Sequence, residues 1–177
     1  GQVTALVTAE ISGVRAIKAR SGDIEMQQQG NLTFLPGPPH PQASEIVAYQ
    51  NTPPADGETQ ANIWITVKDV FQNPIPGVSV TLASTGNALV TQPTELTDGE
   101  GKTRGYVSNT TIETVTITAQ ADGVALIAEA SVTFRGADVI VELEAPNTIG
   151  PGEVLTYQLR VRNLEALPAQ DVSLMHE

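Results

Sequence analysis

The sequence predicts an all-β protein built from antiparallel β-sandwiches, and three features of its 177 residues support this. Apolar and polar residues alternate over short runs, which is the period of a strand buried on one face. Turn-forming residues separate these runs at regular intervals, as in β-sandwiches. No segment keeps a helical apolar stripe for three turns, because the best candidate, residues 164–170, contains Pro168 in its middle.

Several runs carry this alternation, and we expect each of them to form a strand. In residues 61–69, Ile63, Ile65 and Val67 lie on one face, whereas Trp64 and Thr66 lie on the other. The remaining runs of this kind are residues 78–84, 113–121, 130–134 and 156–163.

The segments between the runs are rich in Gly, Pro, Asn and Asp, which favour turns. In the turn at residues 72–77, Pro74 and Pro76 fix φ, and Gly77 adopts a conformation that other residues resist. In the turn at residues 98–101, the short side chain of Asp98 is suited to capping backbone amides. Further turns are expected at residues 55–57, 84–87, 121–123 and 150–152.

Composition and charge exclude several classes of function. The chain has 9 basic and 20 acidic residues, a net charge of −11, without a cluster of Lys and Arg, so we expect no nucleic-acid partner. It has no Cys, which excludes disulfides and thiol nucleophiles, and its two His residues, His40 and His176, lie far apart. No run reaches the roughly 20 apolar residues of a transmembrane helix, so we expect no membrane insertion.

An internal repeat relates the first 35 residues to residues 101–135 at an offset of 100 positions, without a gap. Repeats of this kind indicate that one structural unit recurs along the chain. The first residues therefore correspond to the second half of a unit whose complete copy follows. The identical pairs are Gly1 and Gly101, Val7 and Val107, Ile17 and Ile117, Ala19 and Ala119, Thr33 and Thr133, and Phe34 and Phe134.

A weaker match at an offset of 94 relates residues 67–80 to residues 161–174, with Pro74 opposite Pro168. The two matches together predict three units in tandem. Residues 1–36 form the C-terminal half of one domain, residues 37–136 a complete domain, and residues 137–177 the N-terminal half of a third. The first connector, PGPPHP at residues 36–41, is Pro-rich and therefore stiff. The second, residues 134–138, is very short, which implies adjacent domains in close contact.

Residues 41–135 resemble the bacterial immunoglobulin-like repeats of the invasin and intimin group. The resemblance rests on DGETQANIWITVKDVFQNPIPGVSVTLAS at residues 56–84, a Thr-Asp-x-x-Gly turn at residues 97–101, and the closing SVTF at residues 131–134. Residues 1–35 match the second half of this pattern. PGEVLTYQLRVRN at residues 151–163 resembles a second type of bacterial surface-protein Ig-like repeat. The resemblance implies tandem Ig-like β-sandwiches, one complete and two partial.

The candidate sites each have a simpler structural interpretation. Asp56, Glu58, Asp98, Glu100 and Asp122 lie at expected turns, and carboxylates gathered there are the ligands that Ca²⁺ takes. Asp-Gly is also ordinary turn sequence, and a D-x-D-x-D-G loop is absent, so we expect no metal site.

Two further side chains, on one expected strand, have a functional and a structural interpretation. Lys68 has the chemistry for an intramolecular amide bond, but its context favours a solvated surface residue. Trp64 would stack against a sugar if exposed, and its apolar neighbours favour packing in the core or at a domain interface. A nucleophile–base motif is absent, so we expect no catalytic residues, no cofactor and no enzymatic activity.

The sequence therefore predicts a structural segment of a bacterial surface or extracellular rod, fibre or filament that acts as a spacer. Its expected partners are the flanking Ig-like domains of the same or a neighbouring chain. Two alternatives remain open. In one, the domains are an adhesin that binds a host or neighbouring-cell ligand. In the other, the chain is a filament subunit, and the half-domains are completed by strands of a second copy in a homo-polymer.

Overall fold

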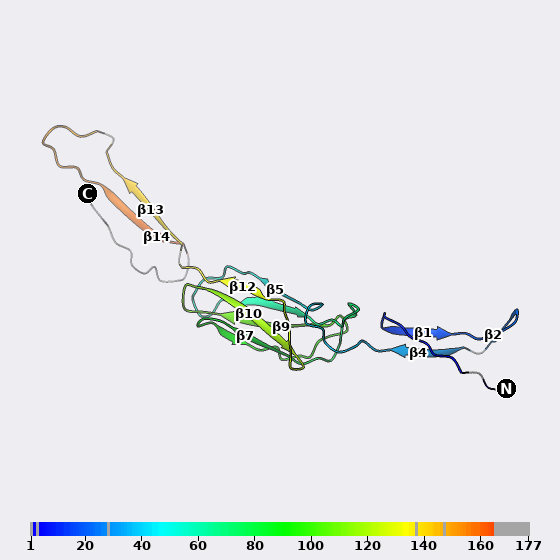
Figure 1. Cartoon of the computed structure of the whole chain (residues 1–177). Helices are drawn as coiled ribbons and strands as arrows, with labels where there is room; N and C mark the ends of the chain where they lie inside the picture. The colour runs from blue at the N-terminus through cyan, green and yellow to red at the C-terminus, as the bar shows by residue number, and fades with distance from the viewer. Residues whose placement is uncertain (1, 3, 28, 137, 147, 165–177) are drawn as a thin grey trace.

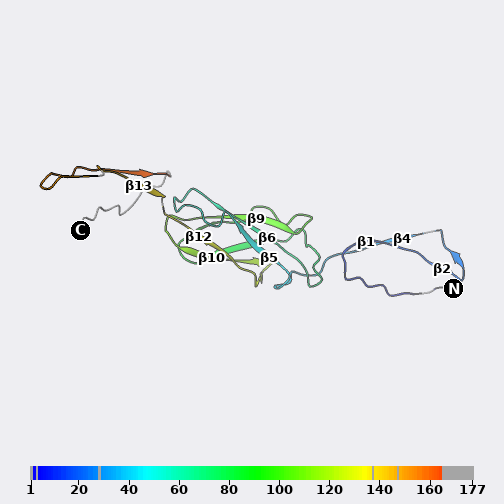
Figure 2. The same ribbon diagram turned by 90° about the horizontal axis from the view of Figure 1, so that it is seen from above.

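The computed structural model describes residues 2, 4–27, 29–136, 138–146 and 148–164. Strands, turns and loops make up these ranges, and none of their residues is helical, so the all-β prediction is confirmed. A central sandwich lies between two hairpins, one at each end of the molecule (Figures 1 and 2). In the described part of the chain, no helix has the length and apolarity needed to cross a bilayer.

Two antiparallel sheets form the central sandwich. The first has the order β5 (Glu45–Tyr49), β6 (Ala61–Thr66), β9 (Lys102–Ser108) and β8 (Leu89–Thr91). In the second sheet, β10 (Thr114–Ala121) pairs with β7 (Val80–Ser84) and with β12 (Ala130–Thr133). The short β11 (Val124–Ala125) extends the hairpin of β10. The two sheets together match the layered architecture of Ig-like domains.

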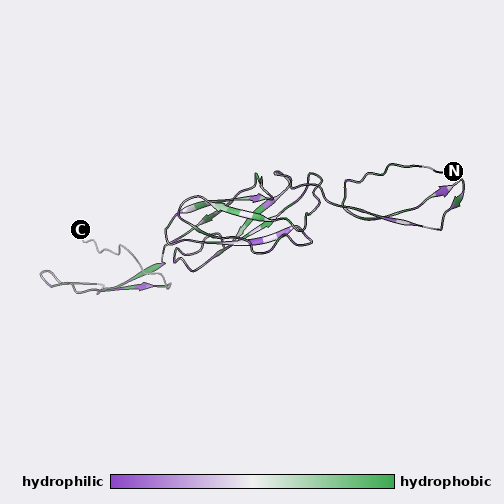
Figure 3. Cartoon of the chain, turned by 90° about the horizontal axis from the view of Figure 1, so that it is seen from below, coloured by the Kyte–Doolittle hydropathy of each residue, from purple (hydrophilic) through white to green (hydrophobic). Residues whose placement is uncertain are grey.

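The core lies between these sheets and is built by the inward residues of the alternating strands. Ile63 and Ile65 of β6 face Val115 and Ile117 of β10, and all four are fully buried. Phe134, just after β12, is the largest fully buried side chain. Figure 3 shows the apolar colouring concentrated in the strands of this unit. At about 25 cal/mol per Å² of buried apolar surface, this core is the main source of the sandwich's stability.

The N-terminal hairpin pairs β1 (Gly13–Ile17) with β4 (Gly30–Phe34), and its tip pairs β2 (Arg20–Ser21) with β3 (Ile24–Glu25). Its register is that of the β10–β12 hairpin shifted by 100 residues. Ile17 lies opposite Gly30 as Ile117 lies opposite Ala130, and the amide of Met26 bonds Ala19 as that of Leu126 bonds Ala119. A second sheet that would cover this hairpin is absent from the described residues.

The C-terminal hairpin pairs β13 (Val139–Glu144) with β14 (Gln158–Asn163) and has one apolar and one charged face. On the apolar face, Val141 lies opposite Val161 and Leu143 opposite Leu159. Val141 and Leu143 are 58% and 63% exposed, so the described chain leaves this face uncovered. Most of the match at residues 161–174, including Pro168, lies outside the described residues, as does His176.

The alternating runs are strands, with β6, β7, β10, β12 and β14 inside the expected ranges, and the turns follow the expected chemistry. The carboxylate of Asp98 accepts the amides of Glu100 and Lys102 at 2.8 and 2.9 Å. Gly101 has φ of 73°, and a Cβ there would lie 2.5 Å from the carbonyl oxygen of Val67. The turn therefore requires glycine at this position.

Trp64 was expected in the core or at a domain interface, and the first of these two placements is wrong. Ile63 and Ile65 point into the core, so Trp64 between them points out, onto the solvent-facing side of the first sheet. There it is half-buried by its strand neighbours rather than by a second layer. Phe134, which is fully buried, supplies the large aromatic side chain of the core.

Candidate functional site

The strongest connections between the central sandwich and the segment before it are made by one loop, residues 69–73, which we call the junction loop. It follows β6 and belongs to the VKDVFQNPIPG sequence of the Ig-like pattern. The amide of Asp69 bonds the carbonyl of Asn73 at 3.0 Å, and the amide of Gln72 bonds the carbonyl of Asp69 at 3.0 Å. Gln72 has φ of 67°, which closes the loop tightly.

Asp69 is the centre of the junction loop, and it is only 1% exposed. Its Oδ1 accepts the amides of Phe71 and Asn73, both at 2.9 Å. Its Oδ2 accepts the side-chain amide of Asn73 at 2.9 Å and the backbone amide of Gly37 at 2.8 Å. Because Gly37 lies in the Pro-rich connector, this carboxylate holds the connector against the sandwich.

The environment of Asp69 keeps it ionised. Burial raises the pKa of this carboxyl, but the hydrogen bonds from Asn73, Gly37 and Phe71 outweigh burial and hold the pKa below the ordinary value. A buried carboxylate that accepts several N–H groups is stabilised in its charged form, because hydrogen bonds to ionised acceptors are stronger than neutral ones. The junction loop is therefore intact at neutral pH.

Asn73 joins the junction loop to the N-terminal segment. Its Oδ1 accepts the backbone amide of Ser12 at 2.9 Å, and its Nδ2 donates to the carbonyl of Glu10 at 2.6 Å. The same Nδ2 donates to Asp69, so one amide group connects the carboxylate to a segment more than 60 residues earlier. Asn is suited to this position because its side chain both donates and accepts, which Asp cannot do when ionised.

The tip of the junction loop adds an apolar contact region. Phe71 is exposed and lines an open hollow of about 610 Å³ together with Ile11, Arg15 and residues 8–10 of the N-terminal segment. The hollow lies beside the Ser12–Asn73 hydrogen bond. The junction therefore combines two buried polar side chains, whose hydrogen bonds are directional, with one aromatic ring, which adds apolar contact area.

The junction after the sandwich is built differently. Arg135 bonds the carboxylate of Asp138 at 3.3 Å, and its Nε donates to the carbonyl of Thr52 at 3.2 Å. The amide of Leu164 bonds the carbonyl of Asp138 at 2.9 Å, which ties β14 to the start of β13. The Arg135 and Asp138 side chains are exposed, and exposed ion pairs contribute only about 0–1 kcal/mol. This junction is therefore held less firmly than the first.

Two of the expected turn carboxylates, Asp56 and Asp98, cap their own turns, whereas Asp122 bonds a residue 43 positions earlier. Asp56 accepts the amides of Glu58 and Thr59, and Asp122 accepts the amide of Ser79 at 3.0 Å. Among the described residues, no three acidic or His side chains come together as a metal site would require. Lys68 forms an ion pair with Glu45 at 2.6 Å across β5 and β6, in agreement with a surface residue.

The roles of Asp69 and Asn73 were not found from the sequence. The alternation predicts Asp69 at the end of the strand run at residues 61–69, and the turn residues predict Asn73 within the turn at residues 72–77. The signal that was present is the spacing of an acid and an amide four residues apart around a turn, immediately after a buried strand. The Asp69 carboxylate already caps the amides of this loop. The second polar side chain, Asn73, is therefore available for a partner outside the loop.

The fold of this chain is similar to that of several solved bacterial adhesin structures. The FdeC adhesin of Escherichia coli superposes with a TM-score of 0.60 at 17% identity, over 84% of this chain and 50% of that one. InvD of Yersinia pseudotuberculosis gives 0.58 at 19% identity, over 86% and 49%. Invasin, a bacterial integrin-binding protein, gives 0.54 at 21% identity, over 81% and 30%. The chain therefore spans half or less of these structures, and the likeness shows the fold.

A family model for the bacterial Ig-like domain (group 1) matches residues 43–135, which is more than half of the chain. The matched range contains every strand of the central sandwich, from β5 to β12, and the junction loop. The resemblance inferred from the sequence motifs is thereby confirmed, and the chain belongs to the bacterial Ig-like domain (group 1) family.

Proposed function

We propose that the chain is a spacer segment of a bacterial surface or extracellular protein, in which Ig-like units are stacked end to end. The observation that carries this proposal is the junction loop, whose buried Asp69 and Asn73 fix the preceding segment and the connector to the central sandwich. A hinge that must bend freely would not use a buried, fully hydrogen-bonded carboxylate, because each bend would break several of these bonds. The segment transmits position and force, and it is not an enzyme.

In this proposal, residues 1–36 are the second half of one Ig-like domain, residues 37–136 a complete domain, and residues 137–177 the first half of a third. The register of β1 and β4, which repeats that of β10 and β12 at an offset of 100, supports the first assignment. The uncovered apolar face of β13 and β14 supports the third, since one sheet of a sandwich needs a second sheet against it.

The missing halves belong to adjoining parts of the same polypeptide in this proposal. The alternative is a homo-polymer in which a second copy of the chain supplies them. The exposed apolar hairpin faces fit both arrangements, and the different sequence types of the two half-domains favour the first. Sedimentation of the 177-residue chain over a range of concentrations separates the two. Completion within one polypeptide predicts no regular polymer, whereas completion between copies predicts filaments that lengthen with concentration.

Spin-label distances test the spacer proposal directly. The chain has no Cys, so labels at Asp23→Cys, in the tip of the N-terminal hairpin, and at Glu129→Cys, in the sandwich, are unique. Both positions are exposed. A stiff junction predicts one narrow distance distribution, and Asn73→Ala broadens it because the bonds to Glu10 and Ser12 are lost.

The matched control is Asn51→Ala, because the hydrogen bond that involves Asn51 is made by its backbone carbonyl. This variant should leave the distribution unchanged. A distribution that is already broad in the unmodified chain, and that Asn73→Ala does not change, contradicts the spacer proposal.

A further inference from the structure

The outer face of the first sheet carries an ordered set of side chains that the spacer role does not use. The strand pairing places them in three rows across β5, β6 and β9, and all of them point away from the core. The middle row contains Trp64 and Arg104 beside Val47, and the flanking rows contain Tyr49 and Tyr106 on one side and Glu45, Thr66 and Lys102 on the other. We call this set the aromatic platform.

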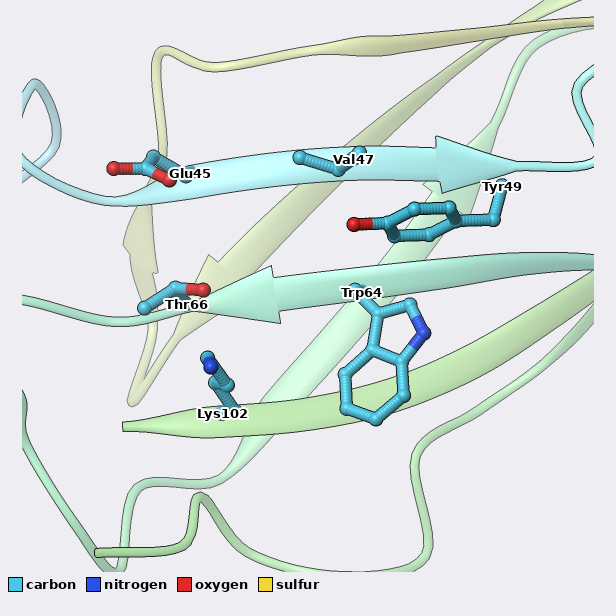
Figure 4. A pocket seen from close by; sticks show the side chains of 6 residues that line it. All are labelled: Glu45, Val47, Tyr49, Trp64, Thr66 and Lys102. Atoms are coloured by element: carbon cyan, nitrogen blue, oxygen red, sulfur yellow. The ribbon is translucent and has the colours of Figure 1, made fainter. Parts of the chain in front are cut away.

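A hollow lies over the part of the platform formed mainly by β5 and β6, and Arg104, the cross-strand neighbour of Trp64, lies beside it rather than in its lining. This open hollow of about 480 Å³ is lined by Glu45, Val47, Tyr49, Trp64, Thr66 and Lys102, which is within the usual range of ligand sites, roughly 300–1,000 Å³. Figure 4 shows the Trp64 ring extending over β9 and the Tyr49 ring lying between β5 and β6. Aromatic rings with a few polar groups around them are the usual lining of a small-molecule site.

Arg104 is held in place by the rings beside it. Its guanidinium lies 5.2 Å from the centre of the Trp64 ring and 5.1 Å from that of Tyr106. Both distances are within the range of cation–π attraction. In the described part of the chain between residues 37 and 136, the other cations, Lys68, Lys102 and Arg135, each pair with a carboxylate, whereas Arg104 has no such ion pair.

An arginine that is oriented by two rings and not neutralised by an acid is suited to bind a carboxylate, because its N–H groups match the two oxygens of that group. The surrounding groups are suited to hydroxyls, since the Thr66 hydroxyl both donates and accepts, and Glu45 accepts. The half-buried ring of Trp64 and the 58% exposed ring of Tyr49 offer flat surfaces to the C–H groups of a sugar ring.

We propose that the aromatic platform binds a carboxylated pyranose, such as a uronic acid residue of a polysaccharide. The sugar ring stacks on Trp64 and Tyr49, its carboxylate meets Arg104, and its hydroxyls bond Glu45, Thr66 and Lys102. The net charge of −11 repels anions at a distance, so recognition depends on these contacts rather than on long-range attraction. The site goes beyond the spacer role and does not depend on it.

Because Trp64 is the only Trp of the chain, its indole N–H gives a single, assigned nuclear magnetic resonance signal at the site. The 177-residue chain is titrated with methyl α-glucuronide, with methyl α-glucoside as the neutral sugar, and with acetate as the carboxylate alone. We expect the glucuronide to shift the indole signal to saturation. We expect the glucoside to bind at least about tenfold more weakly because it lacks the charge-assisted hydrogen bonds, and acetate likewise because it lacks the ring that stacks on the aromatic side chains.

Arg104→Met keeps the aliphatic stem of the side chain and should weaken the glucuronide about tenfold while leaving the glucoside unchanged. The matched control is Arg162→Met, on β14, which should bind as the unmodified chain does. Should Arg104→Met fail to fold, Tyr49→Leu serves instead and should weaken both sugars. An indole signal that no sugar moves overturns the proposal. So does equal binding of glucuronide and glucoside, or a shift that acetate reproduces.

Discussion

The hairpin of β1 and β4 and the hairpin of β10 and β12 have the same register and opposite surroundings. Ile117 and Val132 are fully buried, whereas the residues 100 positions earlier, Ile17 and Leu32, are 37% and 42% exposed. The pairing within a hairpin is therefore encoded locally, by alternation and by the turn at its tip. Burial is not local, because it needs the second sheet that β5, β6 and β9 provide in the central sandwich.

The comparison extends to single positions. Val115 is fully buried in the sandwich, and the residue 100 positions earlier is Arg15, beside the junction loop. Gly22 and Asp122 occupy the same place in the two hairpin tips, and both have positive φ, 59° and 46°. The two copies therefore share the same backbone conformation at this position, although their side chains differ.

The largest expected difference between the hairpins concerns their aromatic residues. Phe134→Ala removes a fully buried ring and should lower the free energy of unfolding of the sandwich by about 3–5 kcal/mol. Phe34→Ala, the same change in the other copy, should alter it by less than about 0.5 kcal/mol. Urea denaturation followed by Trp64 fluorescence measures both. Equal losses would mean that the N-terminal hairpin belongs to the same core.

The next largest effect is expected at the junction loop, in the first half of the central sandwich. Asp69→Asn places an amide group opposite the N–H groups of Gly37 and Asn73, and should lower the free energy of unfolding by about 1–3 kcal/mol at pH 7.

The same variant tests the lowered pKa of Asp69. A carboxyl whose folded pKa lies below its ordinary value of 3.8 stabilises the protein fully above that value. This stabilisation is lost as the pH falls through the folded pKa. The difference between unmodified chain and variant should therefore be constant from pH 7 to pH 5 and shrink below the ordinary pKa. If the difference in free energy of unfolding persists at low pH, the effect of Asp69→Asn comes from packing rather than from the charge of the carboxylate.

The smallest expected effect concerns the two hairpin tips. Asp122→Ala places alanine at a positive φ, which alanine disfavours, and removes the hydrogen bond to the Ser79 amide. The free energy of unfolding of the sandwich should therefore fall by about 1 kcal/mol. Asp122→Gly, which copies Gly22, relieves the backbone and loses only the bond. It should therefore be less destabilising than Asp122→Ala in thermal unfolding. Both variants lose the same side-chain bond, so the reverse order would show that the positive φ does not disfavour alanine at this position.

Strands were predictable from the sequence where one face is apolar and the other polar. In β6 and β10 this alternation is complete. In β5, Val47 and Tyr49 make the outer face apolar as well, so the alternation disappears and the strand was not predicted. In β9, Thr103 and Gly105 point inward, so the core face does not look apolar. Both strands depend on neighbours that alternation does not reveal.

The sites were less predictable than the fold. The apolar neighbours of Trp64 favour packing in the core or at a domain interface, although the alternation of its own strand already puts it on the face opposite Ile63 and Ile65. The sequence predicts Asp69 as the end of a strand run and Asn73 as part of a turn, and it does not reveal their partners Gly37 and Ser12, which are distant along the chain. Contacts between units leave no periodic signal, so they emerge only once both segments have been placed in space.

Hydrogen exchange of the backbone amides tests the central claim most directly, since it reads the two hairpins in one sample. If residues 1–36 are half of an Ig-like domain, the amides of β10 and β12 exchange only on unfolding of the sandwich. Those of β1 and β4 then exchange at least about 100-fold faster, because no second sheet covers them. Equal protection of the two hairpins would contradict the account, because it would make the N-terminal hairpin a complete and independently stable part of the fold.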